Sequence, residues 1–268
     1  MAITALHSAA SGLSALSTEI DVIANNLANS NSTGFKASRV NFEDLLYIEK
    51  AQPGVENANN DSRPTGIYVG LGTRVSGTQL DLEQGDSIIT ERKLDLTIDG
   101  GGFFQVNIGE TSSTGIGYTR AGNFLKNRDG NIVLGNSDGP LLDPVITVPD
   151  DAQTVDINSD GRVFALLSDN SLQELGQIQL ATFINPAGLS QQGANLYVET
   201  EGSGPPIEGV PNDGQFGRII SGSLEGSNVD PVRELISLIK TQRAFELNSQ
   251  SIQAADEALQ VVANLRRF

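Results

Sequence analysis

The sequence of 268 residues contains no cysteine, no tryptophan and a single histidine, His7. Without cysteine it can form no disulfide and no thiolate zinc site, and a catalytic triad would have to use His7. Basic residues are also scarce, because 17 lysines and arginines face 33 aspartates and glutamates, for a formal net charge of −16. Nucleic acids and anionic lipids attract positive charge, so we expect neither as a ligand.

Long hydrophobic runs are absent as well. No stretch approaches the about 18 apolar residues of a membrane-spanning helix. The first basic residue is Lys36, so the N-terminus lacks the charged region of a secretory signal peptide. We therefore expect neither membrane insertion nor a cleaved signal. The 38% of hydrophobic residues fits a folded protein, and the length suits about two domains.

The two ends of the chain differ from its middle in charge. Residues 1–32 contain two acidic residues and no basic one, and residues 229–268 contain five of each. The acidic excess therefore lies in residues 33–228. Since charge is costly to bury, the two ends are the parts best suited to close packing.

The N-terminal segment has the pattern of a packed helix. Small and apolar residues recur from Ala2 to Leu27 at alternating spacings of four and three, which is a heptad seam. We expect the helix to end in the polar turn at 29–34. The large residues predicted to pack against other helices are Leu6, Leu13, Leu16, Ile20, Ile23 and Leu27.

A second heptad pattern lies near the C-terminus. Asn228 or Asp230 is suited to cap this helix, and Pro231 suits its first turn. One column of the seam is polar, which weakens a simple dimeric zipper. The predicted packing residues are Leu235, Leu238, Gln242, Phe245, Ile252 and Leu259.

Pattern alone leaves two arrangements open for these helices. They either fold back as an intramolecular hairpin on the central region or order against copies of the same protein. Burying the six large residues of the first seam contributes about 9–18 kcal/mol, whereas ordering about 30 residues costs about 30–60 kcal/mol in backbone entropy. The first helix therefore needs packing partners.

The acidic middle has the alternation and turn residues of a mostly antiparallel sheet. Strands are predicted at 68–75, 94–98, 103–108 and 177–184. Hairpin turns are predicted at 127–131 and 159–161, and loops or extended arms at 52–66 and 202–217. The predicted fold class is α+β: the terminal heptad helices form a coiled-coil-like domain, and the antiparallel β-rich domain is inserted between them.

Two motifs resemble ligand sites but are better explained as turns. Residues 156–161 match the opening of a calcium-binding loop, but Leu167 occupies the position of the bidentate glutamate. The glycines at 100–102 precede a strand, which favours close backbone approach or a β-bulge over phosphate binding. We therefore expect no catalytic residue, no cofactor and no metal site.

Several motifs resemble those of bacterial flagellar rod and hook proteins. They begin with DVIANNLAN at 21–29, TGFK at 33–36 and FEDLLY at 42–47. Further similar segments follow in family order at 98–106, 118–124, 221–229 and 242–249, so the resemblance spans nearly the whole chain. The residues of the N-terminal family motif are Asn25, Asn26, Asn29, Gly34 and Phe35.

This resemblance implies a structural subunit and not an enzyme. Proteins of this family form a hollow helical shaft in the periplasm that passes torque outward while later subunits travel through its channel. It implies a helical polymer core from 1–34 and 229–268, a connecting segment and arm at 35–75, and a β-rich outer domain at 76–228. The arm residues are Gln52, Pro53, Gly54, Pro64 and Gly66.

The resemblance also implies partners and a location. The partners are copies of the chain, proximal rod proteins, the hook protein, P and L ring proteins and the flagellar type III export apparatus, all at the basal body. It implies that the helices order by assembly. Ala121 departs from the family, where aspartate is common, and residues 110–117 lengthen a hairpin. The alternatives are another axial subunit, or a secreted β-rich adhesin or calcium-binding module.

Overall fold

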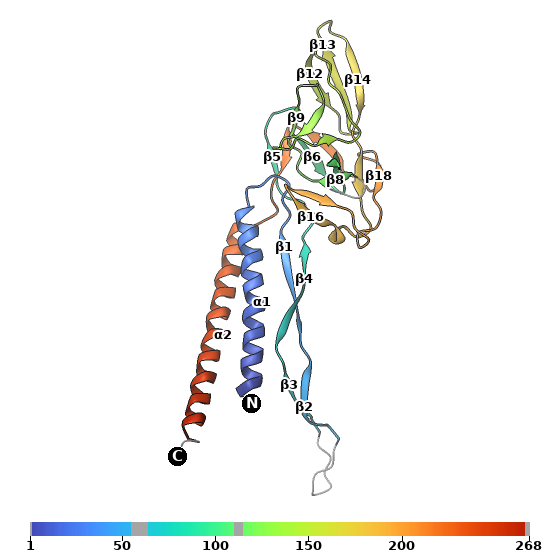
Figure 1. Ribbon diagram of the computed structural model, residues 1–268. Helices are drawn as coiled ribbons and strands as arrows, with labels where there is room; N and C mark the ends of the chain where they lie inside the picture. The colour runs from blue at the N-terminus through green and yellow to red at the C-terminus, as the bar shows by residue number, and fades with distance from the viewer. Residues whose placement is uncertain (1, 55–63, 110–114, 266–268) are drawn as a thin grey trace. The chain divides into compact units, whose positions relative to one another are not determined.

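The computed structural model describes residues 2–54, 64–109 and 115–265 (Figure 1). The chain divides into two compact units. The helical unit contains Met1–Ala28, Ser38–Gln79 and Asp230–Phe268, and the β-rich unit contains Asn29–Ala37 and Leu80–Val229. Helices at the two ends of the chain with antiparallel sheets between them confirm the α+β fold class.

Two long helices form most of the helical unit. Helix α1 spans Ala2–Ala28 and helix α2 spans Pro231–Leu265, and they lie side by side (Figure 1). Asp230 caps α2, because its Oδ1 accepts hydrogen bonds from the backbone N–H groups of Val232 and Arg233 at 3.0 and 3.3 Å. Of the two predicted caps, Asp230 is the one whose carboxylate binds the first turn.

A two-part ribbon completes the helical unit. Strand β1 (Ser38–Asp44) pairs with β4 (Thr73–Leu80), and β2 (Tyr47–Ala51) pairs with β3 (Ile67–Gly70). The prediction of one continuous strand at 68–75 is wrong, because the chain breaks at Gly72, whose φ of +113° suits glycine. Of the predicted arm, residues 55–63 lie outside the described residues.

A nine-stranded sheet is the centre of the β-rich unit. Its order is β16-β17-β8-β7-β11-β10-β9, with β15 also beside β7 and β18 beside β15. The bounds of these strands are β7 Phe103–Asn107, β8 Ile116–Thr119, β9 Phe124–Lys126, β10 Ile132–Leu134, β11 Leu141–Leu142, β15 Leu180–Thr182, β16 Ser190–Gly193, β17 Leu196–Val198 and β18 Ile207–Gly209.

Three smaller sheets and a short helix complete this unit. They comprise β12 (Ala152–Ile157), β13 (Arg162–Leu167) and β14 (Leu172–Gln177); β6 (Leu96–Asp99) with β19 (Arg218–Ser221); β5 (Ser87–Ile89) with β20 (Ser223–Glu225); and the 3₁₀ helix Pro186–Gly188. The core beneath the sheets is fully apolar at its centre, where Phe104, Val106, Phe124, Leu142 and Val163 are buried.

The turn predictions for the middle are largely confirmed. Residues 127–131 join β9 to β10, and residues 159–161 join β12 to β13, as antiparallel hairpins. Two other predictions are wrong. The stretch 177–184 is divided between the end of β14 and β15, and the stretch 202–217, predicted as a loop or an extended arm, contains β18, which pairs with β15 in the central sheet.

Candidate assembly interface

The contact between the two helices uses small and polar residues. A methyl group at Gly12 would lie 3.1 Å from Nδ2 of Asn248, so the helices approach closely there. Thr241, near the middle of α2, is buried on the same side. Several large apolar residues of α2 nevertheless remain exposed.

The opposite side of α2 is apolar and exposed. We call it the outward stripe, and its residues are Val232, Ile236, Ile239 and Leu247, which are 66, 48, 58 and 63% exposed. At about 100° per residue these positions fall on one side of the helix, away from Thr241. Large apolar side chains exposed along one side of a helix, here with Arg243 among them, mark a candidate interaction surface.

The predicted packing residues divide between these environments. In α1, Ile23 is buried, whereas the other five seam residues are half-buried. In α2, Leu238 and Ile252 are half-buried, and the predicted set also contains four exposed members, Leu235, Gln242, Phe245 and Leu259. The predicted packing set does not include Val232, Ile236 and Leu247, although their helical spacing can be read from the sequence.

Asn26 of the N-terminal motif forms hydrogen bonds to two other segments of the helical unit. It is buried near the end of α1, where its Oδ1 accepts from Ser38 N at 3.0 Å and its Nδ2 donates to Ser38 O at 2.8 Å. The same Nδ2 donates to Oε1 of Glu234 at 3.3 Å. One side chain thereby joins α1, the start of β1 and the first turn of α2. Burial raises the pKa of Glu234 at this position.

The two other asparagines of the motif lie around the end of α1. Asn25 is exposed. Asn29 forms the polar turn that follows the helix, since its Oδ1 and its carbonyl oxygen accept bonds from Oγ and N of Ser32, both at 3.1 Å. The predicted polar end of the helix is therefore confirmed.

Helix α1 also holds the break in the ribbon. Oγ of Ser11 accepts from Thr73 N at 3.3 Å, and Oγ of Ser8 donates to Gly70 O at 3.3 Å. His7 Nδ1 lies 3.1 Å from Leu71 O. Because these side chains are short, the ribbon backbone lies directly against the helix, and a side chain at Gly72 would collide with Ser11.

The TGFK motif packs within the β-rich unit. Gly34 has φ +68°, and a methyl group there would lie 2.5 Å from the backbone N of Ala121, so only glycine fits. Gly34 N donates to Glu225 O at 2.8 Å. Phe35 is half-buried. Ala121 is buried against this turn.

Lys36 ends the motif in a buried ionic cluster. Its Nζ lies 2.6 Å from Oε1 of Glu225, and Arg120 reaches Oε2 of Glu225 at 3.3 Å. Arg120 also lies over the ring of Phe103. Burial lowers the pKa of Lys36 and of Arg120, and the carboxylate of Glu225 opposes that change in both. Such charges are retained in a protein interior only when they are paired.

The two motifs weighed as ligand sites both lie in the β-rich unit. Gly161 has φ +79° in the β12–β13 hairpin, and Asp156 pairs with Lys93 at 2.6 Å. Gly102 has φ +126° and lies against Leu180, as expected for close backbone approach. Across residues 2–54, 64–109 and 115–265, no three His, Cys, Asp or Glu side chains are grouped so as to hold a metal ion.

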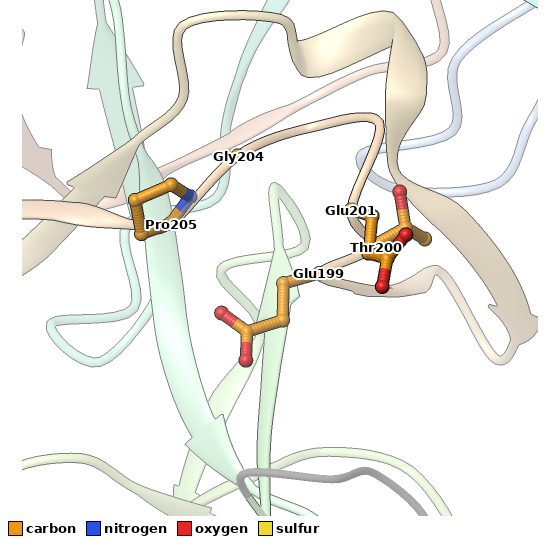
Figure 2. Close-up of a pocket in the computed structure, with 5 residues that line it drawn as sticks. All are labelled: Glu199, Thr200, Glu201, Gly204 and Pro205. Atoms are coloured by element: carbon orange, nitrogen blue, oxygen red, sulfur yellow. The ribbon is translucent and has the colours of Figure 1, made fainter.

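A surface hollow of about 470 Å³ lies at the turn after β17, lined by Glu199, Thr200, Glu201, Gly204 and Pro205. In Figure 2 the side chains of Glu199 and Glu201 point in different directions. Thr200 shapes the turn, because its Oγ1 donates to Gly188 O at 2.6 Å. The two carboxylates therefore do not form the facing pair that acid–base hydrolysis uses.

Comparison with known proteins decides the family. Three family models match: Flagella basal body rod protein at residues 6–36, Flagellar hook protein FlgE/F/G D1 domain at 97–165, and Flagellar basal body rod FlgEFG protein C-terminal at 220–265. Flagellar basal-body rod protein FlgG of Agrobacterium fabrum is 44% identical over 97% of this chain and 98% of its own length. The chain belongs to the flagellar basal-body rod protein family. It is a structural subunit of the flagellar rod.

Further relatives favour the rod over the hook. The FlgG protein of Caulobacter vibrioides is 41% identical over 98% of this chain and 99% of its own length. Flagellar hook protein FlgE of Salmonella typhimurium is 40% identical over 51% of this chain but only 32% of its own. The family model at the N-terminal end includes Asn26, and the one at the C-terminal end includes Glu225. Neither helix in the described parts of the chain is long and apolar enough to cross a membrane.

Proposed function

We propose that this rod-family protein polymerises with copies of itself into the hollow distal rod of the flagellum. The assembly is a drive shaft that carries torque from the motor to the hook, and its channel passes export substrates. The proposal rests on the full-length similarity to proteins named as basal-body rod proteins and on one surface of the helical unit.

The outward stripe of α2 is the observation that carries this proposal. Its four large side chains are about half exposed or more, whereas Thr241 on the other side of α2 is buried and Asn248 lies against Gly12 of α1. Burying one such side chain is worth about 1.5–3 kcal/mol. A neighbouring copy that covers the stripe supplies the packing that the helix pair does not supply to itself. The predicted packing residues of both helices belong to the same proposed interface.

The ribbon is the second proposed contact between copies. It exposes large apolar residues, with Leu46 between β1 and β2, Tyr47 in β2 and Ile67 in β3. The arm residues Gln52, Pro53, Gly54, Pro64 and Gly66 follow β2 or precede β3 in the sequence. We infer that this arm bridges neighbouring subunits and stiffens the polymer. A two-stranded ribbon with exposed aromatic and aliphatic side chains is stabilised when another surface covers those side chains.

The same proposal includes further partners and a location. In the periplasmic part of the basal body, the subunit contacts proximal rod proteins, the hook protein and the surrounding P and L ring proteins. It reaches this place through the flagellar type III export apparatus. It binds no nucleic acid, inserts into no membrane and catalyses no reaction.

Polymerisation of the intact chain tests this proposal. Sedimentation and electron microscopy compare the wild type with Ile236→Ser/Ile239→Ser, which removes the middle of the outward stripe, and with Gln250→Ser/Gln253→Ser, which changes exposed polar positions on the same helix. The wild type and the polar control are expected to form helical polymers and the stripe variant to remain dispersed. A wild type that stays monomeric at every concentration, even with rod ends added, contradicts the proposal.

A further inference from the structure

The chain passes between its two units four times, after residues 28, 37, 79 and 229. On the side of the β-rich unit, these passages involve three segments: 33–37, 81–85 and 225–228. All three belong to the β-rich unit. Polar side chains of Glu225 and Asn228 bind the other two segments, so the three segments are held together by more than the covalent chain.

Glu225 is fully buried and makes four contacts with the other segments and the sheet. Its Oε1 accepts from Lys36 Nζ at 2.6 Å and from Gly85 N at 3.1 Å. Its Oε2 accepts from Arg120 at 3.3 Å, and its backbone oxygen accepts from Gly34 N at 2.8 Å. The carboxylate therefore joins segment 33–37 to segment 81–85.

Asn228 makes the same connection three residues later. Its Oδ1 accepts from Ala37 N at 2.7 Å, and its Nδ2 donates to the backbone oxygens of Asp81 and Glu83 at 2.9 and 3.2 Å. Asp81 N donates in turn to Ala37 O at 2.8 Å. Every polar atom of the Asn228 side chain is thus used to bind chain that leads directly into the helical unit.

We propose that Glu225 and Asn228 form a clamp that fastens the chain passages together at the edge of the β-rich unit, and that force passes through this clamp when the subunit is loaded. The force-carrying part rests on the proposed function as a drive-shaft subunit. The clamp itself rests on the contacts above. Without it, torque would be carried by separate linkers, which can bend independently.

The energetics favour a positioning role over a purely stabilising one. Apolar residues of similar volume stabilise a core as well as a buried ion pair does, because burying charge is costly. Two cations, Lys36 and Arg120, share the single carboxylate of Glu225. What the charges add is geometry, because both cations must converge on one carboxylate, and a loss of Glu225 would leave two buried cations without their counter-charge.

Hydrogen exchange on the dilute, intact protein tests the clamp. The variant is Asn228→Ala. The control is Lys93→Met, which removes the Lys93–Asp156 pair, an exposed pair with the same 2.6 Å separation as the pair of Lys36 and Glu225. We expect the amides of Ala37, Asp81 and Gly34 to exchange about 10–100-fold faster in Asn228→Ala. The amides of Ile132 and Leu134 in the central sheet are expected to keep their wild-type exchange, and the control to alter neither group.

Two further variants test individual bonds of the clamp. Asn228→Asp keeps the oxygen that binds Ala37 N, so that amide is expected to stay better protected than in Asn228→Ala. Lys36→Met is expected to raise exchange at Gly34 and Gly85. Unchanged exchange at the clamp amides in Asn228→Ala overturns the proposal. Equal acceleration at Ile132 and Leu134 also overturns it, because that result indicates general loss of stability.

The force-carrying part has its own measurement. Polymers of Asn228→Ala are imaged by electron microscopy beside polymers of the wild type and of Lys93→Met, and we expect only the first to show raised curvature or breakage. Polymers that are as straight as the wild type overturn this part. If the wild type forms no polymer, the proposed function fails, whereas the exchange experiment still decides whether the clamp exists.

Discussion

The side-chain amide of Asn26 pairs with both backbone groups of Ser38, with distances of 3.0 Å to the nitrogen and 2.8 Å to the oxygen. It acts as a substitute for a strand neighbour at the point where β1 begins. Aspartate has no donor for the Ser38 oxygen and a hydroxyl is too short to satisfy both groups. The pairing gives a physical reason for an asparagine at this position of the family motif.

Replacing this asparagine should destabilise the helical unit. In Asn26→Ala the N–H and C=O of half-buried Ser38 lose their bonds to the Asn26 side chain, and Oε1 of Glu234 loses its bond from Asn26 Nδ2. We expect the free energy of unfolding to fall by about 2–3 kcal/mol, because three hydrogen bonds that join α1 to β1 and α2 are removed. Denaturant unfolding followed by circular dichroism measures it. Ser17→Ala, at an exposed position of α1, is the control, and an equal effect of both changes argues against the assigned role.

Replacing Gly34 by alanine should destabilise the protein more than the same change at another glycine with positive φ. Gly34→Ala combines a left-handed backbone with the approach of the Ala121 nitrogen, and we expect a loss of about 3 kcal/mol. Gly139 has φ +55° but nothing within 4 Å of the added methyl group, so Gly139→Ala should cost about 1 kcal/mol. Thermal unfolding of both variants separates the two effects, because Gly139→Ala introduces backbone strain alone and Gly34→Ala introduces backbone strain together with a steric clash. Similar losses contradict the packing assigned to the TGFK motif.

Tyr118 gives a prediction about stability and pH. Its hydroxyl is buried with no hydrogen-bond partner among the described residues, and burial raises its pKa to about 12. Because the native pKa exceeds the ordinary value near 10, the unfolded chain releases this proton first as the pH rises. Stability is therefore fully present below about pH 10 and falls toward pH 12.

Tyr118→Phe should lose less stability over this pH range than the wild type and should be at least as stable at pH 7, since an unpaired buried hydroxyl is removed. Urea unfolding at pH 7, 10 and 11 measures both effects. Tyr68→Phe is the control, because Tyr68 is exposed and bonded to Glu49. Identical pH profiles for the wild type and Tyr118→Phe contradict the prediction. Tyr197, whose pKa burial also raises to about 12, contributes equally to both proteins.

The arm offers a test of polymer stiffness. Replacing residues 52–66 by a two-residue Asn-Gly turn keeps the strands β2 and β3, which end at Ala51 and begin at Ile67. We expect the monomer to unfold at the wild-type temperature and its polymers to be curved or short-lived in electron micrographs. Straight, long-lived polymers from the shortened chain would remove the bridging role from the arm.

The helices and the hairpin turns could be predicted because local signals determine them. The heptad spacing of both ends and the Asp-Gly turn at 160–161 depend only on neighbouring residues. The ribbon break and strand β18 could not, because each is set by a distant partner. Gly72 packs against Ser11 of α1, and Ile207–Gly209 pairs with β15.

The interface could be predicted only in part. A heptad seam indicates which side of a helix is apolar, but it does not say which neighbour covers that side. In α2 the described contact with α1 uses Thr241 and Asn248, and the apolar Val232 and Ile236 face away from it. The buried pair of Lys36 and Glu225 could not be predicted from the sequence either, because its members are 189 residues apart and no local pattern connects them.

The accessibility of the outward stripe tests the central claim most directly. The chain has no cysteine, so Ile239→Cys introduces a single thiol on the stripe and Leu172→Cys a single thiol on the exposed face of the β-rich unit. Alkylation rates are measured in dilute and in polymerised protein. We expect the thiol at 239 to react readily when dilute and at least about tenfold more slowly in the polymer, with little change at 172. Equal rates at 239 in both states contradict the account, because they leave the stripe uncovered in the assembly that it is proposed to build.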